Sequence, residues 1–127
     1  MSALLPHISH RRIETPPLCL IALTGEHDLS TTPDVERILT KAVASGEPVV
    51  VDLQYATFVD SSILCLIIRA ADQARRRGLA VVLPSDGEVA RLFDLVDASA
   101  MLMAFPTLPR AIAWCYPLTI GDEADWG

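Results

Sequence analysis

The stretch Pro48–Ser62, PVVVDLQYATFVDSS, decides the fold of this 127-residue chain. Three consecutive β-branched valines at 49–51 and Leu53 are typical of a strand that is buried on both faces. A second apolar step follows at Phe58 and Val59, after which the sequence turns polar and then becomes a long helical pattern. A carboxylate and two hydroxyls therefore lie where a strand gives way to a helix, at the sheet edge where α/β proteins meet ligands and partners.

Asp60, Ser61 and Ser62 occupy this junction. A helix N-terminus offers unpaired N–H groups and the positive end of a dipole, which together accommodate an anion such as a phosphate. Capping of the helix by Asp60 or Ser61 is the ordinary structural role of such residues. Capping alone explains neither the second serine nor the second acidic loop expected at Glu26–Asp28.

The rest of the chain alternates short apolar runs with helical patterns. This alternation predicts one α/β domain, a single layer of mostly parallel mixed sheet with four to five strands and about four helices. We expect the domain at residues 8–116, with flexible termini at 1–7 and 117–127. The expected strands are an edge strand at 8–14 and strands at 18–23, 49–53, 79–83 and 103–105. The expected helices run from a Thr32 cap to Gly46, over 61–77, from a Ser85–Glu88 capping box to 96, and over 108–116.

The amino-acid composition argues against several classes of protein. Half of the residues are hydrophobic and a fifth are charged, which is typical of a folded domain. A net charge of −6 argues against nucleic acid as the main partner, because binding phosphates needs clustered cations. The apolar runs are too short to span a bilayer, and the N-terminus lacks the order of a secretory signal. We therefore expect a cytoplasmic protein that does not insert into membranes.

Enzyme and metal motifs are scarce. The three cysteines, Cys19, Cys65 and Cys115, have no zinc-binding spacing and are expected to be core residues, with a redox role left open. The sequence has no Walker loop and no G-x-G-x-x-G, so no cofactor is expected. A serine hydrolase would need a base for Ser61 or Ser62, and His27 is the one histidine placed in a rim loop. That alternative stays open, although no G-x-S-x-G elbow is present.

Three segments together resemble the STAS domain of anti-sigma factor antagonists, also called anti-anti-sigma factors. They are LCLIALTGEHD before a helix, VVVDLQYATFVDSS, and RRRGLAVVLPSDGEVARLFDLV. The resemblance covers about residues 8–116. It implies a phosphoprotein of transcription regulation that works by partner switching and is a binding module rather than an enzyme.

The resemblance also implies roles for individual residues. Ser61 would be phosphorylated by an anti-sigma factor that is itself a serine kinase, and a PP2C-type phosphatase would remove the phosphate. The unphosphorylated chain, a monomer or weak dimer, would bind the anti-sigma factor and so release a sigma factor. The partner-binding residues would be Asp28, Asp60, Ser61, Ser62 and Ile63.

One departure from the family pattern bears on this assignment. The family usually has Gly-Leu-Gly after the two serines, whereas this chain has Ile63-Leu64-Cys65. If Ile63 points outward, it changes kinase choice or blocks phosphorylation; if it points inward, it is a core residue. Two other functions also remain as alternatives: a STAS subunit of a lipid-transport ABC complex or stressosome-like assembly, and a small serine hydrolase.

Overall fold

The computed structural model describes residues 5–74, 78–95 and 102–116. Within these ranges strands and helices alternate as the sequence predicts, and the α/β class is confirmed. None of the described helices is long and apolar enough to cross a membrane. The elements are β1 (His7–Glu14), β2 (Pro17–His27), the 3-10 helix η1 (Leu29–Thr31), α1 (Thr32–Ala44), β3 (Val49–Asp52), β4 (Ala56–Val59), α2 (Ser61–Gln73), β5 (Leu79–Val82), α3 (Glu88–Leu95), β6 (Met103–Phe105) and α4 (Leu108–Cys115).

The strands form one mixed sheet in the order β1-β2-β3-β5-β6. The β1–β2 hairpin is antiparallel and every other pairing is parallel. β4 pairs with the last part of β2, beyond the segment of β2 that pairs with β3. The described sheet thus has six strands, one more than the upper expectation, because the apolar step at Phe58 and Val59 belongs to a strand of its own.

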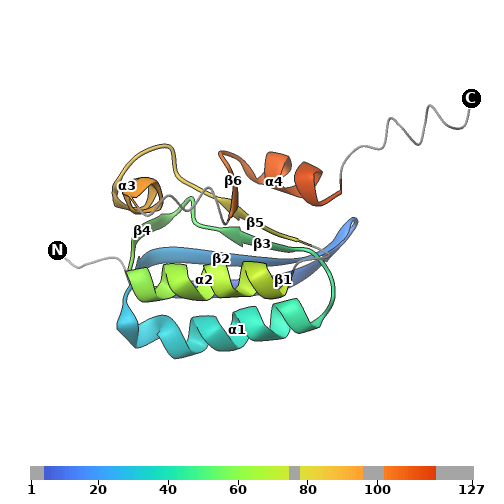
Figure 1. The fold of residues 1–127 in the computed structure, drawn as a ribbon, viewed down its shortest axis with the longest axis horizontal. Coiled ribbons are helices and arrows are strands. Elements are labelled where there is room, and N and C mark those ends of the chain that lie inside the picture. Colours follow the sequence, from blue (N-terminus) through green and yellow to red (C-terminus); the bar gives the residue numbers. More distant parts are fainter. Residues whose placement is uncertain (1–4, 75–77, 96–101, 117–127) are drawn as a thin grey trace, which may run out of the picture.

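The buried valines of β3 divide the core into two parts. Val49 and Val51 face the cluster that α1 and α2 cover, whereas Val50 faces the cluster that α4 covers. Side chains alternate between the faces of a strand, so a run of three valines has to be buried on both sides. Figure 1 shows α1 and α2 on one side of the sheet and α4 on the other, with α3 beside β4.

The second strand is longer than the sequence predicts. The strand expected at 18–23 is too short and the loop expected at Glu26–Asp28 begins too early, because β2 continues to His27. Gly25 has a φ of +80°, which glycine adopts at little cost, and the pairing register with β4 shifts between Gly25 and Glu26. β2 continues through this irregularity to the rim of the sheet, where the candidate site lies.

Two predicted helix starts are displaced. Thr32 is the first residue of α1 rather than its cap, and α3 begins at Glu88, so Ser85 and Glu88 do not form a capping box. The described part of α2 ends at Gln73, and the predicted extension over 75–77 lies outside the described residues, as does residue 96. Of the termini expected to be flexible, only 5–7 are described, and His7 there begins β1.

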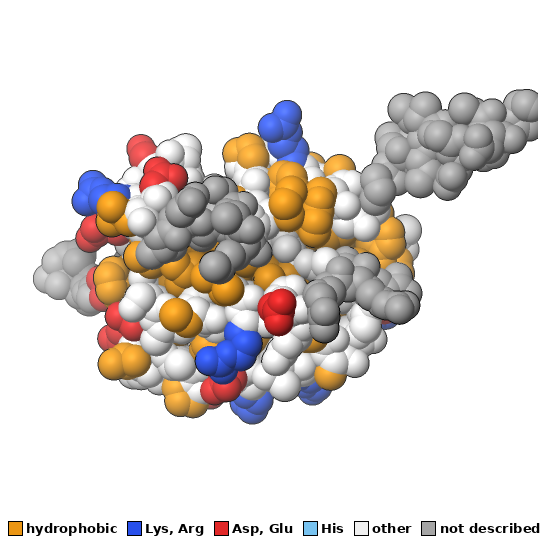
Figure 2. Space-filling view, viewed as in Figure 1, with side chains coloured by type: hydrophobic (Ala, Val, Ile, Leu, Met, Phe, Trp, Pro, Cys, Tyr) orange, Lys and Arg blue, Asp and Glu red, His pale blue; other side chains and the backbone are white. Residues whose placement is uncertain are grey.

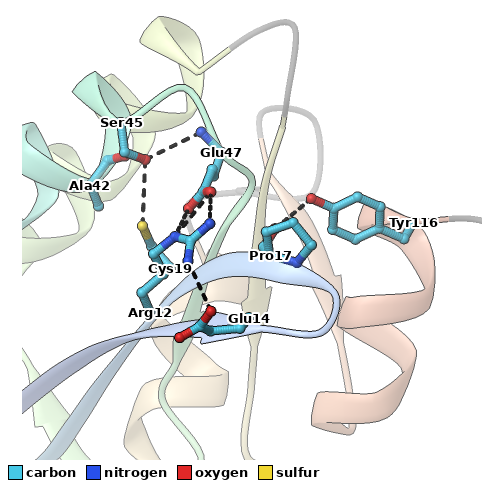
Figure 3. Close-up of polar contacts among 8 residues, drawn as sticks. All are labelled: Arg12, Glu14, Pro17, Cys19, Ala42, Ser45, Glu47 and Tyr116. Atoms are coloured by element: carbon cyan, nitrogen blue, oxygen red, sulfur yellow. Dashed lines mark hydrogen bonds and ion pairs between the residues drawn. The ribbon is translucent and has the colours of Figure 1, made fainter.

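The β1–β2 hairpin is tied to both layers of helices at its closed end (Figure 3). The Arg12 guanidinium donates from Nε to Oε1 of Glu47 at 2.9 Å and from Nη2 to Oε2 at 2.6 Å. On the other side of the hairpin, the Tyr116 hydroxyl after α4 donates to the carbonyl of Pro17. These two contacts hold the closed end of the hairpin from both faces of the sheet.

Candidate functional site

The junction of β4 and α2 is built around the carboxylate of Asp60. Asp60 is the N-cap of α2, and its Oδ2 accepts hydrogen bonds from the backbone N–H of Ser62 at 3.0 Å and from the Ser62 hydroxyl at 2.6 Å. Ser61 lies between these two residues and is exposed. No hydrogen bond of its hydroxyl to another described residue is present. The structure therefore presents one free hydroxyl at the mouth of the helix.

A second acidic turn lies beside the first. β2 and β4 end in register at His27 and Val59, and the N–H of Asp60 donates to the carbonyl of His27 at 2.8 Å. The next residue along β2 is Asp28, whose Oδ1 accepts from the N–H of Ser30 at 2.9 Å and from its hydroxyl at 2.5 Å. Parallel pairing of the two strands thus places two Asp-x-Ser turns side by side.

Both carboxylates are held in the ionised form. Hydrogen bonds from Ser62, first from its hydroxyl and then from its N–H, lower the pKa of Asp60. The same two kinds of bond from Ser30 lower the pKa of Asp28. The charge of Asp28 acts in the opposite direction on the pKa of Asp60 and raises it, which shows that the two groups sense one another. The rim around Ser61 consequently carries two fixed negative charges at neutral pH.

Ser62 differs from Ser61 in its surroundings. It is half-buried, and its hydroxyl lies 3.2 Å from Oγ1 of Thr32 in addition to its bond to Asp60. Thr32 in turn lies 3.4 Å from the carbonyl of Asp28. The Ser62 hydroxyl therefore links the starts of α1 and α2, and it is much less accessible to an enzyme than that of Ser61.

The structure corrects the assignment of Ile63 to the partner-binding residues. Its side chain is 0% exposed and belongs to the core cluster beneath α1 and α2. Position 63 follows the exposed Ser61 and the half-buried Ser62 and lies on the stripe of α2 that faces the sheet. Of the two alternatives left open by the sequence, the inward one is correct, and this side chain cannot contact a partner.

The structure also removes the base that a serine hydrolase would need. His27 is the last residue of β2, not part of a rim loop, and it is 0% exposed. Its Nδ1 lies 3.1 Å from Oγ1 of Thr31 and its Nε2 lies 3.0 Å from the carbonyl of Thr24. Burial lowers the pKa of the ring. With both ring nitrogens engaged inside the protein, His27 cannot take a proton from Ser61.

Two hydrophobic side chains flank the acidic turns. Leu29, directly after Asp28, is 69% exposed, and Phe58, two residues before Asp60, is 39% exposed. Figure 2 shows acidic side chains along the end of the molecule at which α2 begins, with hydrophobic ones between them. These two side chains add apolar area beside the fixed charges of the rim.

The three cysteines are all free and are not grouped at this site. Cys65 is exposed on α2, while Cys19 and Cys115 are half-buried, and burial raises the pKa of Cys115 to about 11. The sequence placed all three in the core, and the exposure of Cys65 corrects that expectation. Within the described ranges, His, Cys, Asp and Glu side chains form no cluster that could hold a metal ion.

Some of the site could not be seen in the sequence. The bridge from Thr32 to Ser62 joins residues 30 positions apart, and the neighbouring positions of Asp28 and Asp60 depend on the pairing of β4 with β2. One local signal was available, because D-L-S at 28–30 and D-S-S at 60–62 share the same Asp-x-Ser pattern. That pattern is typical of a side chain that caps the backbone two residues on.

Comparison with known proteins identifies the family to which this fold belongs. The model of the STAS domain family matches residues 10–111, and the chain belongs to this family. A search of curated proteins gave no significant match. Among solved structures, an anti-sigma factor antagonist from Mycobacterium paratuberculosis is 21% identical with a TM-score of 0.78, over 87% of this chain and 94% of that chain.

A second similar structure is that of the anti-sigma factor antagonist SpoIIAA in its unphosphorylated form. It is 19% identical with a TM-score of 0.71, over 89% of this chain and 99% of that chain. The Bacillus cell fate determinant SpoIIAA in its phosphorylated form is also 19% identical, with a TM-score of 0.60 over 84% and 96% of the two chains. At these identities the likeness establishes a SpoIIAA-like fold.

Proposed function

We propose that this chain is an anti-sigma factor antagonist whose binding is controlled by phosphorylation of Ser61. The observation that carries the proposal is the exposed, unbonded hydroxyl of Ser61, which lies between the N-cap Asp60 and Ser62 at the start of α2. The names of the similar structures support it, since one of them occurs in an unphosphorylated and a phosphorylated form. In this proposal the partner is an anti-sigma factor serine kinase, a PP2C-type phosphatase reverses the reaction, and the chain itself catalyses nothing.

The hydrogen bonds of the first turn of α2 determine where a phosphate on Ser61 would lie. The N–H groups of Ser62, Ile63 and Leu64 all donate to the side chain or carbonyl of Asp60. A phosphate on Ser61 therefore finds these donors occupied and stays outside the helix mouth. It brings a charge of about −1.5 to −2 next to Asp60 and Asp28.

This arrangement makes the switch electrostatic. A partner surface that matches two carboxylates, a neutral hydroxyl and the apolar Leu29 and Phe58 would face an additional uncompensated charge after phosphorylation. Like charges brought together in a desolvated interface cost several kcal/mol, which corresponds to orders of magnitude in affinity. The fold does not have to change, because the contacts of the buried Ile63 and the half-buried Ser62 at the start of the helix are not altered.

Incubation with the kinase and ATP, followed by intact-mass measurement, tests the proposal. We expect one phosphate on the wild-type chain, one on Ser62→Ala and none on Ser61→Ala. Ser62→Ala is the matched control, because it removes the neighbouring hydroxyl and leaves the exposed one. Phosphorylation of Ser61→Ala to the wild-type level would show that another residue accepts the phosphate.

A further inference from the structure

His27 is a buried titratable side chain at the end of β2, next to Asp28, and the proposed binding function makes no use of it. The residue is 0% exposed. Its Nε2 lies 3.0 Å from the carbonyl of Thr24, and its Nδ1 lies 3.1 Å from Oγ1 of Thr31. The Thr31 hydroxyl also lies 3.2 Å from the carbonyl of Asp28, to which it can donate. These contacts form one chain that runs from β2, through the ring, to the first acidic turn.

The number of hydrogens in this chain distinguishes the neutral ring from the protonated one. A carbonyl only accepts, so Nε2 has to carry the hydrogen that points at Thr24. In the neutral ring Nδ1 is then an acceptor, and the one hydrogen of the Thr31 hydroxyl serves either the ring or Asp28, but not both. The imidazolium has a second N–H, which donates to Thr31 and leaves the hydroxyl hydrogen for Asp28. The observed geometry therefore gives every contact a hydrogen when His27 is protonated.

Burial and the surrounding polar groups act on the ring in opposite directions. Burial lowers the pKa of His27 from its ordinary value of 6.5, so protonation needs acidic solution. The carbonyls of Thr24 and His7 and the charge of Asp28 favour the protonated ring, whereas the charge of a protonated His7 on β1 opposes it. From β4, which ends in register with β2, the charged neighbour is Asp60. The protonation of this ring therefore depends on the charges of the rim.

The chain of contacts continues from the first acidic turn to the start of α2. The Thr32 hydroxyl lies 3.4 Å from the carbonyl of Asp28 and 3.2 Å from the hydroxyl of Ser62, which donates to Asp60. The N–H of Asp60 donates directly to the carbonyl of His27 at 2.8 Å. A charge added at the start of α2 therefore lies beside the residues that hold the ring. Negative charge close to a histidine favours its protonated form.

We propose that His27 is a proton-binding site whose occupancy is coupled to the charge of the acidic rim. In mildly acidic solution Nδ1 takes a proton from the solvent, the Thr31 hydroxyl turns to the carbonyl of Asp28, and a positive charge appears beside that aspartate. Negative charge at position 61 strengthens proton binding and, by reciprocity, the proton favours a charged position 61 to the same extent. Only this last consequence, that acidity and phosphorylation of Ser61 reinforce one another, rests on the proposed function.

NMR titration of the histidine rings in the full-length chain tests proton binding directly. The signals are followed between about pH 7.5 and pH 4.5, and the signal that is missing from His27→Gln identifies the ring. We expect His27 to titrate within this range. Thr31→Val removes the acceptor of the Nδ1 hydrogen and should lower the proton affinity about tenfold, whereas Thr31→Ser keeps the hydroxyl and should stay within about twofold of the wild type. A wild-type ring that stays neutral throughout, or an unchanged midpoint in Thr31→Val, overturns the proposal.

Charge changes at the rim test the coupling in the same titration. Ser61→Asp should raise the proton affinity of His27 about threefold and Asp28→Asn should lower it about threefold, since each changes one negative charge near the ring. The matched control Asp72→Asn removes an exposed carboxylate from the last turn of α2 and should change the affinity by less than about 1.5-fold. Equal affinities in Ser61→Asp and the wild type overturn the coupling. Failure of the kinase to modify Ser61 would refute the proposed function without altering these titrations, which need no partner.

Discussion

The two Asp-x-Ser turns at 28–30 and 60–62 share their local geometry but differ in the middle residue. In each turn the aspartate accepts a hydrogen bond from the N–H and the hydroxyl of the serine two positions on. The middle residue is exposed in both turns, but it is Leu29 in the first and Ser61 in the second. The first turn begins a three-residue 3-10 helix, whereas the second begins the 13-residue α2.

This difference separates the capping role from the proposed switching role. The aspartates and the outer serines do the structural work in both turns, so the middle position is left free for another purpose. In the turn at 28–30 that position offers an apolar contact, and in the turn at 60–62 it offers a hydroxyl that can be modified. If the two roles are separate, the two middle residues and the two aspartates should respond differently when they are changed.

The largest effect is expected from a charge at position 61. Ser61→Asp should weaken binding of the anti-sigma factor by roughly a hundredfold, because a third negative charge joins Asp60 and Asp28 in the interface. Leu29→Asp places the same charge in the equivalent position of the other turn and should weaken binding about tenfold. Calorimetric titration of each variant gives the two values. Equal losses would show that position 61 has no special place in the interface.

A smaller effect on binding is expected when the sign of Asp28 is reversed. Asp28→Lys should weaken partner binding by about tenfold while leaving the circular dichroism spectrum and the melting temperature nearly unchanged. Asp28 caps only one 3-10 turn and is exposed, so little of the fold depends on it. A large fall in the melting temperature would mean that the whole fold depends on Asp28, and not only the turn at 28–30.

Asp60 should contribute more than Asp28 to the stability of the fold. Asp60→Ala removes the N-cap of a 13-residue helix, and we expect the melting temperature to fall by roughly 3–5 °C. Asp28→Ala should lower it by less than about 1–2 °C, since only η1 loses its cap. Thermal unfolding followed by circular dichroism compares the two variants directly. A larger loss for Asp28→Ala would reverse the proposed ranking of the two caps.

The pH dependence of stability follows from the same hydrogen bonds. The pKa values of Asp60 and Asp28 are lowered in the folded protein from an ordinary value of 3.8. Their ionised forms therefore contribute stability that is complete above about pH 4–5 and is lost as the pH falls through the folded-state pKa values. Asp60→Asn keeps a capping oxygen without a titrating charge, so it should lose less stability than the wild type between pH 5 and pH 3 in urea unfolding. A parallel decline of both proteins would show that other carboxylates control acid unfolding.

The smallest effect is expected at Ile63. Ile63→Val should lower the free energy of unfolding by about 1 kcal/mol, since a buried methylene is removed from the core. It should leave phosphorylation of Ser61 unchanged, because the side chain does not reach the surface. Urea unfolding and the intact-mass assay measure the two properties on the same sample. A changed rate of phosphate transfer would indicate that the helix start has moved.

Local sequence patterns were sufficient for most of the fold. The three valines of β3 and the helical spacing of α1 and α2 predicted elements that the structure contains. The errors concentrate where long-range pairing determines the outcome. β2 extends past Gly25 because β4 pairs with it, and His27 is buried because it ends that longer strand. A single sequence does not show this pairing.

The candidate site also has features that the local sequence predicts and features that depend on long-range packing. The position of Ser61 after a buried strand and before a helix predicted the exposed hydroxyl and the Asp60 cap. The closeness of Asp28 depends on the parallel register of two strands, and the Thr32–Ser62 contact on the packing of two helices. Ile63 could not be oriented from the sequence, because a one-step rotation of α2 would move it from the core to the surface.

Affinity before and after phosphate transfer tests the central claim most directly. The wild-type chain is titrated against its anti-sigma factor in the unphosphorylated form, after stoichiometric phosphorylation at Ser61, and again after treatment with a PP2C-type phosphatase. We predict that phosphorylation raises the dissociation constant by roughly a hundredfold or more and that removal of the phosphate restores the first value. An unchanged dissociation constant in the phosphorylated form would contradict the proposal that the charge at Ser61 is the switch.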